Sequence, residues 1–413
     1  MKNYLQLSGQ ISLEGSKSIL NRILIIATFL EEPLKIMNPS NCSDISTMLN
    51  NLSKLGLNVE KKELSWNVLP LRNIRKQGSM FISDSGSAWR FLTARLASIP
   101  RTAYTIEVSE QLQKRPMKPL WDILSKMGAV IKYSESKAKI KGANLKGGVH
   151  DLLADISSQF LSSLLLIAPS YKIDLELFLD GNIVSRPYLE MTIKIMQEFG
   201  IIVDFSGNRI FIQKGQSYNN LKEYTIEPDY SSACYIWALG ALSRSEIYTN
   251  KGNSSSVQPD YKFLDILQTM GANVKIESNK IGVCRKILKG ITIDMQAMPD
   301  QVPTLAVLAL FANSKTRILN IGHLKYKESD RINGLITQLS EIGAKLTYEN
   351  DVMTIKPLDT IPGDVILETY RDHRLIMAFY ILKLIFPQIN IKNSTFTEKS
   401  YPNFLNDIRS LIS

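Results

Sequence analysis

The chain has 413 residues, of which 44% are hydrophobic and 21% are charged, a composition typical of a globular protein. A chain of this length exceeds one compact core, so we expect two domains. The 49 lysine and arginine residues outnumber the 39 acidic residues, which gives a net charge of +10 and favours anionic partners.

Several classes of protein are disfavoured by the sequence. The longest apolar runs, such as residues 23–30, are too short to span a bilayer, and the first residues lack the pattern of a secretory signal. The three cysteines are odd in number and scattered, and with the three histidines they show no metal-site spacing. No basic tract alternates with aromatic residues as in a nucleic-acid module. We therefore expect a cytoplasmic protein that holds no structural or catalytic zinc and binds small phosphorylated or carboxylated molecules.

The predicted elements follow a repeat of about 72 residues. Each copy ends a helical pattern with a glycine and continues with a short apolar strand, and the copies read LSKLGLNV, LSKMGAVI, MQEFGIIV, LQTMGANV and LSEIGAKL. The glycines are Gly56, Gly128, Gly200, Gly271 and Gly343. We interpret them as helix caps, because glycine adopts positive φ without a Cβ penalty. After each glycine the pattern predicts two strands, a helix, a strand and a second helix.

Five full copies and a remainder make six units, which divide into two domains of three. The C-terminal residues FLNDIRSLIS are similar to the helix before the glycine, and the N-terminal YLQLSGQISLEG alternates like a strand pair. We expect the two ends to complete the sixth unit together.

Polar and charged residues recur at the two predicted helix starts of each unit. Asp84, Ser157, Asp229, Asp300 and Asp372 lie 28 or 29 residues after a glycine, and Arg115, Ser185, Lys327 and Glu328 lie 13 to 16 residues before the next. Capping explains residues such as Asp229. It does not explain the cations, because the helix dipole disfavours positive charge at a helix start. The cations are Lys17, Arg22, Arg115, Lys327, Arg331, Arg374 and Lys399, and they predict an anion site.

Three loops before helices strengthen the prediction of an anion site. EGSKSILNR at 14–22 places backbone amides beside Lys17 and Arg22, and SDSGSAWR at 83–90 contains Gly86, which permits close approach of a ligand. ISSQF at 156–160 offers two hydroxyls and an amide, although a plain cap explains these residues equally well.

Acid–base chemistry requires titratable groups near the anion site. Asp300 and Glu328 are the candidates, because each lies at a predicted helix start. The alternative interpretation of Glu328 and its neighbour Asp330 is a solvated face of ion pairs. His373 is expected to be structural, whereas Arg374 offers a fork for a carboxylate or phosphate.

These segments resemble, in order along the chain, the 5-enolpyruvylshikimate-3-phosphate synthases, which are 3-phosphoshikimate 1-carboxyvinyltransferases of the enolpyruvyl transferase family. The similarity lies in GSKSxxNR at 15–22, SGSAWR at 85–90, KRPM at 114–117, SSQF at 157–160, SRPY at 185–188, MPD at 298–300, KESDR at 327–331, DHR at 372–374 and EKSYP at 398–402. The resemblance implies an inside-out α/β barrel of six βαβαββ repeats in two domains, residues 1–14 with 228–413 and residues 15–227. The active site would occupy the interdomain cleft of a monomer.

The resemblance also implies a reaction and residue roles. The enolpyruvyl group of phosphoenolpyruvate would pass to the 5-hydroxyl of shikimate 3-phosphate with release of phosphate. Asp300 would act as the base and Glu328 as the acid, with Lys17 as a third catalytic residue. Shikimate 3-phosphate would contact Lys17, Ser18, Arg22, Ser157, Ser158, Gln159, Ser185, Tyr188, Asp300, His323 and Lys327. Phosphoenolpyruvate would contact Lys17, Gly86, Arg115, Gln159, Arg331, Arg374 and Lys399. No cofactor, metal, nucleic acid or membrane is implied.

The chain departs from the family pattern at several positions. Glu14 and Phe91 stand where proline is common, and Asp84 and His323 stand where asparagine is common. Asp84 would repel a carboxylate substrate unless a cation offsets it, so its role stays open, as does that of His323. Gly86 is retained, which predicts sensitivity to glyphosate.

Two other functions remain open at this point. A UDP-N-acetylglucosamine enolpyruvyl transferase would share the repeat but usually carries a loop cysteine near KRPM, and this chain has no cysteine between Cys42 and Cys234. A nucleic-acid-binding or RNA-end-processing protein on a similar repeat is favoured only by the basic charge.

Overall fold

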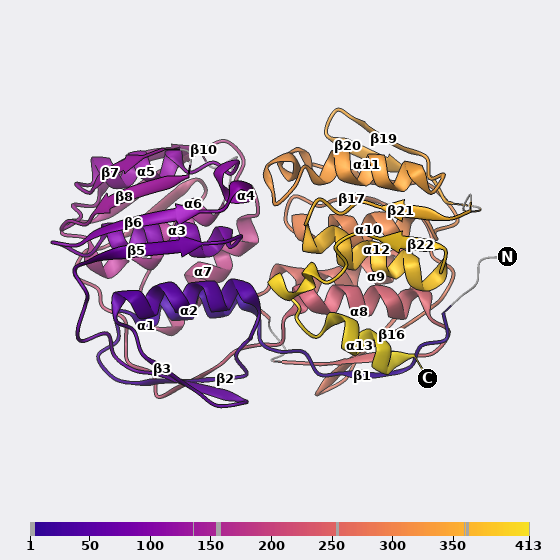
Figure 1. The fold of residues 1–413 in the computed structure, drawn as a ribbon, viewed down its shortest axis with the longest axis horizontal. Helices are drawn as coiled ribbons and strands as arrows, with labels where there is room; N and C mark the ends of the chain where they lie inside the picture. Colours follow the sequence, from indigo (N-terminus) through magenta and orange to yellow (C-terminus); the bar gives the residue numbers. More distant parts are fainter. Residues whose placement is uncertain are drawn as a thin grey trace. The chain divides into compact units, whose positions relative to one another are not determined.

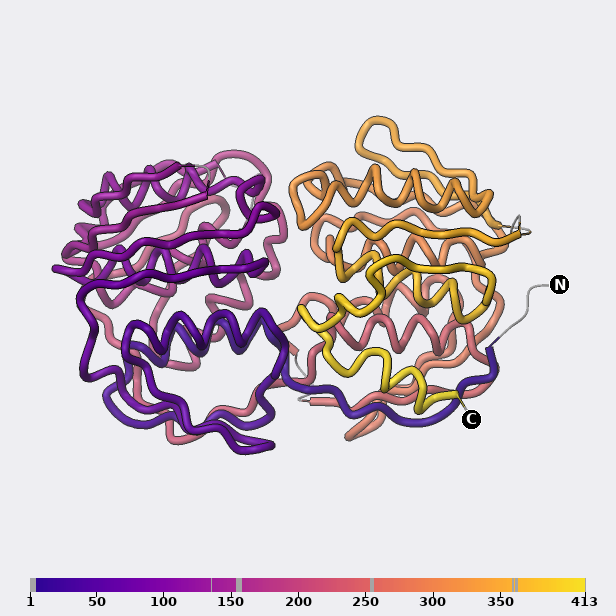
Figure 2. Tube along the Cα trace, in the orientation of Figure 1, coloured from indigo at the N-terminus to yellow at the C-terminus, as the bar shows by residue number. Residues whose placement is uncertain are grey.

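The computed structural model describes residues 5–134, 136–153, 158–252, 256–358, 360 and 363–412. The chain forms two compact units (Figures 1 and 2). Unit 1 comprises Met1–Glu14 and Glu227–Ser413, and unit 2 comprises Gly15–Ile226.

Unit 2 contains three four-stranded sheets, ordered β13-β2-β4-β3, β5-β6-β8-β7 and β11-β12-β10-β9. Its strands are β2 (Leu34–Met37), β3 (Val59–Lys61), β4 (Ser65–Val68), β5 (Gln77–Ile82), β6 (Ala103–Val108), β7 (Val130–Tyr133), β8 (Lys137–Lys141), β9 (Gly148–Leu153), β10 (Leu175–Asp180), β11 (Asp204–Ser206), β12 (Arg209–Ile212) and β13 (Glu223–Thr225). Its helices are α1 (Lys17–Ala27), α2 (Ser43–Leu55), α3 (Gly86–Ala97), α4 (Glu110–Gln113), α5 (Lys118–Lys126), α6 (Ser158–Leu166), η1 (Ala168–Ser170) and α7 (Arg186–Glu198).

Unit 1 contains two four-stranded sheets, β1-β14-β16-β15 and β17-β18-β20-β19, and the two-stranded sheet β21-β22. Its strands are β1 (Gly9–Ile11), β14 (Ile247–Asn250), β15 (Asn273–Ile276), β16 (Lys280–Cys284), β17 (Thr292–Asp294), β18 (Thr316–Leu319), β19 (Leu346–Glu349), β20 (Val352–Ile355), β21 (Val365–Leu367) and β22 (Ile389–Ile391). Its helices are α8 (Tyr230–Leu242), η2 (Pro259–Lys262), α9 (Phe263–Met270), η3 (Pro299–Gln301), α10 (Val302–Ala309), η4 (Gly322–Tyr326), α11 (Arg331–Glu341), α12 (His373–Ile385), η5 (Phe396–Lys399) and α13 (Phe404–Leu411).

The four-stranded sheets share one pattern, which β5 to β8 illustrate. β5 runs parallel to β6, with Gln77 opposite Ala103, and β8 runs antiparallel to both β6 and β7. With α3 after β5 and α5 after β6, this is a βαβαββ unit. The predicted α/β class and the repeated unit are confirmed. The prediction from the pattern alone omitted the short parallel strand that precedes the first helix of each unit, such as β13 before α8.

Helices occupy the interior of each unit, and sheets cover it. In unit 1, α8, α10 and α12 pack against one another, and all thirteen residues of α8 are buried. In unit 2, α1, α3 and α6 pack together in the same way. The strands alternate instead, as in β8, whose residues are exposed and buried in turn. This burial pattern is the inside-out arrangement that the resemblance implies.

The five repeat glycines cap helices as predicted. Each has a positive φ, between 82° at Gly343 and 119° at Gly128. At Gly56 a Cβ would also lie 2.4 Å from the carbonyl oxygen of Asn73, so the chain there requires glycine for conformation and for space.

The chain ends differ from the prediction. β1 does not complete the sixth unit but pairs in parallel with β14, with Gly9 opposite Ile247, as the first strand of another sheet. Among the described residues the sixth sheet consists of β21 and β22. The ends do meet, because Leu7 forms an isolated antiparallel bridge with Ile412. β13 is likewise supplied from a distant segment to pair with β2.

Candidate active site

The predicted acid–base residues of unit 1 converge on one cluster. Asp300 lies in η3 ahead of α10, and Arg331 begins α11. Asp372 is the N-cap of α12, and Arg374 lies in its first turn. Because α10, α11 and α12 contact one another, residues at the same phase of the repeat are brought together.

Arg331 is the centre of this cluster, and its side chain is 1% exposed. Its Nη1 donates to Asp300 Oδ1 at 2.9 Å, and its Nη2 donates to Glu328 Oε2 at 2.8 Å. Its Nε donates to Asp372 Oδ2 at 2.8 Å. One guanidinium therefore joins both predicted catalytic carboxylates to a third, buried carboxylate.

Two further cations complete the cluster. Arg374 Nη2 donates to Asp300 Oδ2 at 3.1 Å, and its Nη1 donates to the Tyr235 hydroxyl at 3.3 Å. Lys399 Nζ donates to Glu328 Oε1 at 3.3 Å. The side chains of Arg374 and Lys399 are 2% exposed, whereas that of Asp300 is 26% exposed. The carboxylate that is predicted to be the base is thus the most accessible member of this ionic cluster, since Glu328 is 14% exposed.

The electrostatics of the cluster follow from these contacts. Burial acts to raise the pKa of Asp300, but the charges of Arg374, Arg331 and Lys327 outweigh burial and hold that pKa well below its usual range. Burial acts to lower the pKa of Arg331, and the three carboxylates raise it above the ordinary value instead. Asp300 is therefore ionised at neutral pH and tightly held by cations.

His323 lies in η4 near the same cluster. Burial, with the charges of Lys327 and Arg331, lowers the pKa of His323 to about 3, against an opposing effect of Asp300. Its buried Nε2 has no hydrogen-bond partner among the described residues. The imidazole is therefore neutral at neutral pH, and any substrate contact it makes is that of a neutral group.

Replacing His323 by Asn is expected to flatten the pH dependence of unfolding. The unfolded histidine takes up a proton near its ordinary pKa of about 6.5 and the folded one does not, so stability falls as the pH drops from 6.5 toward 3. The slope is at most about 1.4 kcal/mol per pH unit. Thermal melts at pH 7, 5.5 and 4 measure this slope in the wild type and in the variant. An unchanged slope in the variant contradicts the lowered pKa of His323.

The first predicted loop of unit 2 lies at the start of α1. Lys17 Nζ pairs with Asp44 Oδ2 at 2.7 Å. Arg22 is buried, and it donates to Thr192 Oγ1 at 2.7 Å and to the Ser18 carbonyl at 2.6 Å. It also donates to the Tyr188 carbonyl at 3.2 Å. Burial lowers the pKa of Arg22 to about 10. In this structure Arg22 therefore ties α1 to α7.

The serine-rich positions lie on α6 and α7. Ser158 begins α6, and Gln159 Nε2 donates to Ser87 Oγ at 3.3 Å, while Ser157 lies outside the described residues. Ser185 is the N-cap of α7 with a φ of 56°, a left-handed conformation that a residue with a Cβ rarely adopts. Such strain is concentrated at functional sites.

Gly86 lies where two arginines pack against the start of α3. A Cβ on Gly86 would lie 2.3 Å from Arg115 Nη1 and 2.8 Å from Arg90 Nη1. Arg90 also donates to the Gly86 carbonyl at 3.2 Å. The neighbouring Asp84 accepts a hydrogen bond from Ser109 Oγ at 2.9 Å, which gives its carboxylate a local partner.

Four residues of these clusters were missing from the predicted site. Asp372 and Asp44 hold Arg331 and Lys17, Tyr235 holds Arg374, and Arg90 packs beside Gly86. Asp372 and Arg90 lie inside the DHR and SGSAWR motifs, so their positions were available from the sequence. Nothing in the sequence marked Tyr235 and Asp44 as site residues, because their helices show only ordinary apolar and capping patterns.

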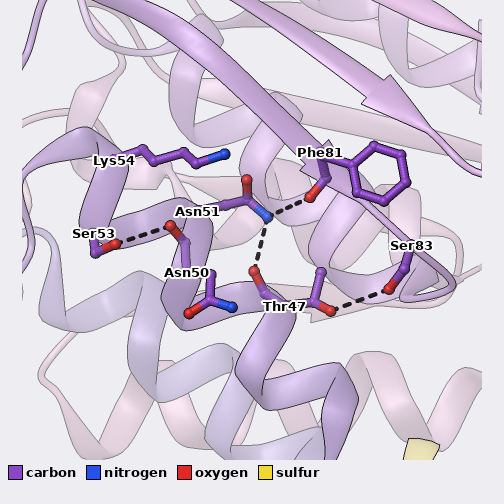
Figure 3. Close-up of a pocket in the computed structure, with 7 residues that line it drawn as sticks. All are labelled: Thr47, Asn50, Asn51, Ser53, Lys54, Phe81 and Ser83. Atoms are coloured by element: carbon purple, nitrogen blue, oxygen red, sulfur yellow. Dashed lines mark hydrogen bonds between the residues drawn. The ribbon is translucent and has the colours of Figure 1, made fainter.

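A separate hollow of about 550 Å³ lies in unit 2 between α2 and β5 (Figure 3). Asn51 Nδ2 donates there to the carbonyls of Thr47 and Phe81, both at 2.8 Å. The lining residues are Thr47, Asn50, Asn51, Ser53, Lys54, Phe81 and Ser83. None of the predicted site residues lines this hollow, and its single charged residue gives it no acid–base pair.

The described residues contain neither a membrane-spanning helix nor a cluster of metal ligands. No helix in the described part of the chain is long and apolar enough to cross a membrane. Among the same residues, no group of three or more histidine, cysteine, aspartate or glutamate side chains is arranged to hold a metal ion.

Comparison with known proteins gives consistent matches over the whole chain. Residues 2–408 match the family described as EPSP synthase (3-phosphoshikimate 1-carboxyvinyltransferase). The 3-phosphoshikimate 1-carboxyvinyltransferase of Colwellia psychrerythraea is 34% identical over 413 residues, which cover 98% of this chain and 96% of that protein. The enzyme of the same name from Psychromonas ingrahamii is 35% identical over 421 residues, with 98% and 97% covered.

Solved structures agree on the fold. The EPSP synthase of Acinetobacter baumannii superimposes with a TM-score of 0.80 at 22% identity, over 100% of this chain and 98% of that one. The enolpyruvyl transferase NikO of Streptomyces tendae gives a TM-score of 0.78 at 15% identity, over 98% and 95%. At these identities the likeness concerns the fold alone.

Proposed function

The chain belongs to the EPSP synthase (3-phosphoshikimate 1-carboxyvinyltransferase) family, and we propose from this premise how its residues carry out the family's reaction. It transfers the enolpyruvyl group of phosphoenolpyruvate to the 5-hydroxyl of shikimate 3-phosphate and releases phosphate, a step of aromatic amino acid biosynthesis. The observation that supports the mechanism is the bridge from Arg331 to both Asp300 and Glu328.

We propose that Asp300 and Glu328 are the base and the acid. In the addition step Asp300 takes the proton of the 5-hydroxyl, the hydroxyl oxygen bonds to C2 of phosphoenolpyruvate, and Glu328 protonates C3. In the elimination step Glu328 takes a proton back from C3, the C2=C3 double bond re-forms, and the C2–O bond to phosphate breaks. The cations stabilise the departing phosphate, which takes up the hydroxyl proton from Asp300 and so returns the base to its ionised form.

Substrate binding also prepares the base in this proposal. Without ligand, Arg331 and Arg374 are paired with Asp300, whose low pKa makes it a weak base. An anionic group of phosphoenolpyruvate on these arginines takes over part of their charge, so the pKa of Asp300 rises toward the operating range. Asp300 is thereby activated only when the second substrate is present.

We propose the remaining roles from the family resemblance. Phosphoenolpyruvate contacts Lys17, Gly86, Arg115, Gln159, Arg331, Arg374 and Lys399, and Lys17 also takes part in catalysis. Shikimate 3-phosphate contacts Lys17, Ser18, Arg22, Ser157, Ser158, Gln159, Ser185, Tyr188, Asp300, His323 and Lys327. For Arg22 this role requires that it exchange a protein partner for the phosphate, because its donors now bind Thr192, Ser18 and Tyr188.

The partners are proposed to be these small anions alone. We propose a monomer that acts without nucleic acid. The described cysteines Cys42, Cys234 and Cys284 are free thiols, which supports a reducing compartment, the cytoplasm. Sedimentation of the purified protein tests the monomer, and a second species at assay concentration contradicts it.

The activity is tested by phosphate release from phosphoenolpyruvate with two alternative acceptors. Release is expected with shikimate 3-phosphate and not with UDP-N-acetylglucosamine. Release with the latter alone refutes the assignment. The comparisons do not favour that second activity, since the family and the relatives named above carry the shikimate name.

Replacing Gly86 by Ala is expected to raise the KM for phosphoenolpyruvate about tenfold, the loss of one charge-assisted hydrogen bond. The new Cβ would meet the guanidinium of Arg115 at 2.3 Å and displace it. Because a flexible side-chain end is displaced, the Tm should change little. Steady-state kinetics with each substrate varied measure this, and an unchanged KM for phosphoenolpyruvate removes Arg115 from that pocket.

A further inference from the structure

Asp372 is a buried carboxylate without a role in the mechanism above. Its side chain is 0% exposed, and both of its oxygens accept hydrogen bonds from the protein. Its Oδ2 accepts from Arg331 Nε at 2.8 Å and from Ser329 Oγ at 3.0 Å. Its Oδ1 accepts from the Arg374 backbone amide at 2.9 Å and from Arg331 Nη2 at 3.4 Å. Both oxygens therefore accept hydrogen bonds from the guanidinium of Arg331, along the edge formed by Nε and Nη2.

These two hydrogen bonds from Arg331 to Asp372 fix the plane of the guanidinium. Two of the three nitrogens of Arg331, Nε and Nη2, bind Asp372, so rotation about the last side-chain bonds would break both contacts. One hydrogen of Nη1 is then directed toward Asp300. The remaining hydrogen of Nη2 meets Glu328. The positions of the two reacting carboxylates thus depend on Asp372 through one rigid group.

We propose that Asp372 is a positioning residue, which acts through Arg331 to hold the phosphoenolpyruvate-binding guanidinium and both reacting carboxylates in register. This inference rests on the proposed function of Asp300, Glu328 and Arg331. Charge matters as well as geometry. Without Asp372 the buried cation would be balanced only by Asp300 and Glu328, which it would draw away from the substrate.

The competing explanation is that Asp372 only caps α12. Its contact with the Arg374 amide is an N-cap bond, which stabilises the start of the helix. Asp330 is a matched control, because it caps the neighbouring helix α11 through the Asn333 amide at 3.1 Å. The side chain of Asp330 also accepts from Asn333 Nδ2, within its own helix.

The variants Asp372→Asn and Asp372→Ser separate the two roles, since Asn and Ser are good N-caps without charge. We expect the KM for phosphoenolpyruvate to rise by a factor on the order of 10 to 100 and kcat to fall. The KM for shikimate 3-phosphate should change less than threefold, because eight of its eleven proposed contacts belong to unit 2. Asp330→Asn should leave both KM values unchanged.

A double-mutant cycle with Arg331→Lys tests whether Asp372 acts through Arg331. Lysine keeps the charge and loses the fork. The double variant Asp372→Asn with Arg331→Lys should be no worse than Arg331→Lys alone, because the interaction is already lost. Additive losses overturn the inference.

The other possible results also decide whether Asp372 positions Arg331. A lower Tm with both KM values unchanged makes Asp372 a cap and overturns the inference. So does failure of both Asp372 variants to fold while Asp330→Asn folds. A normal KM for phosphoenolpyruvate in Arg331→Lys is a different result, since it refutes the proposed role of Arg331 itself.

Discussion

Replacing Asp300 by Asn is expected to abolish most of the turnover and at the same time to tighten the binding of phosphoenolpyruvate. The loss of the base should lower kcat by a factor on the order of 10³. The tighter binding follows from the ion pairs, because Asp300 accepts from Arg331 at 2.9 Å and from Arg374 at 3.1 Å. An anionic ligand must compete with Asp300 for these donors, and the neutral amide of Asn competes less.

The expected gain in affinity is about tenfold, or roughly 1.4 kcal/mol, which is less than one hydrogen bond to a charged group contributes. Calorimetric titration of phosphoenolpyruvate without shikimate 3-phosphate measures it, since no turnover occurs. Asp265→Asn, an exposed residue of α9, should leave both quantities unchanged. Weaker binding in Asp300→Asn refutes the competition, whereas near-normal kcat removes Asp300 as the base.

Replacing Glu328 by Gln is expected to lower kcat by a factor of about 10² to 10⁴ through loss of the acid at carbon. Glu328 exchanges protons with C3 in both steps of the proposed mechanism. In D2O the wild type should therefore introduce deuterium into the methylene group of phosphoenolpyruvate when shikimate 3-phosphate is present. The variant should lose this exchange as completely as it loses turnover.

The exchange is followed by the proton NMR signal of the methylene group. Glu341→Gln, at the exposed end of helix α11, which begins three residues after Glu328, is the matched control and should behave as the wild type. Exchange that persists in Glu328→Gln while phosphate release is lost would assign C3 protonation to another group. The role of Glu328 would then be to hold Arg331 and Lys399, with which its carboxylate pairs.

Much of the fold could be predicted from the sequence, because one physical requirement recurs along the chain. A helix that turns back into a strand needs positive φ at its end, and glycine marks that point in five copies. The strands β1 and β13 could not be predicted in the same way. Each has three residues and pairs with a strand far along the chain, so neither local periodicity nor a neighbouring turn marks it.

The unit 1 cluster was predictable for the same reason. Asp300 and Arg374 lie at equivalent helix starts, and helices packed in a repeat bring such starts together. The partners of these residues were harder to predict, because contacts between side chains depend on tertiary geometry. Tyr235, in the fully buried helix α8, is one example. For Arg22 the motif predicted a ligand contact, but it did not reveal that the guanidinium donors bind other parts of the protein in this structure.

The supply of β1 and β13 from distant segments sets an order of events during synthesis. Residues 15–226 are contiguous and include β13, so unit 2 is complete while the rest of the chain is still on the ribosome. β1 has to wait, because its partner β14 begins at Ile247. Until then β1 has no partner strand, and the bridge of Leu7 with Ile412 forms only after the end of the chain has emerged, so the N-terminal segment is among the last elements to find its place.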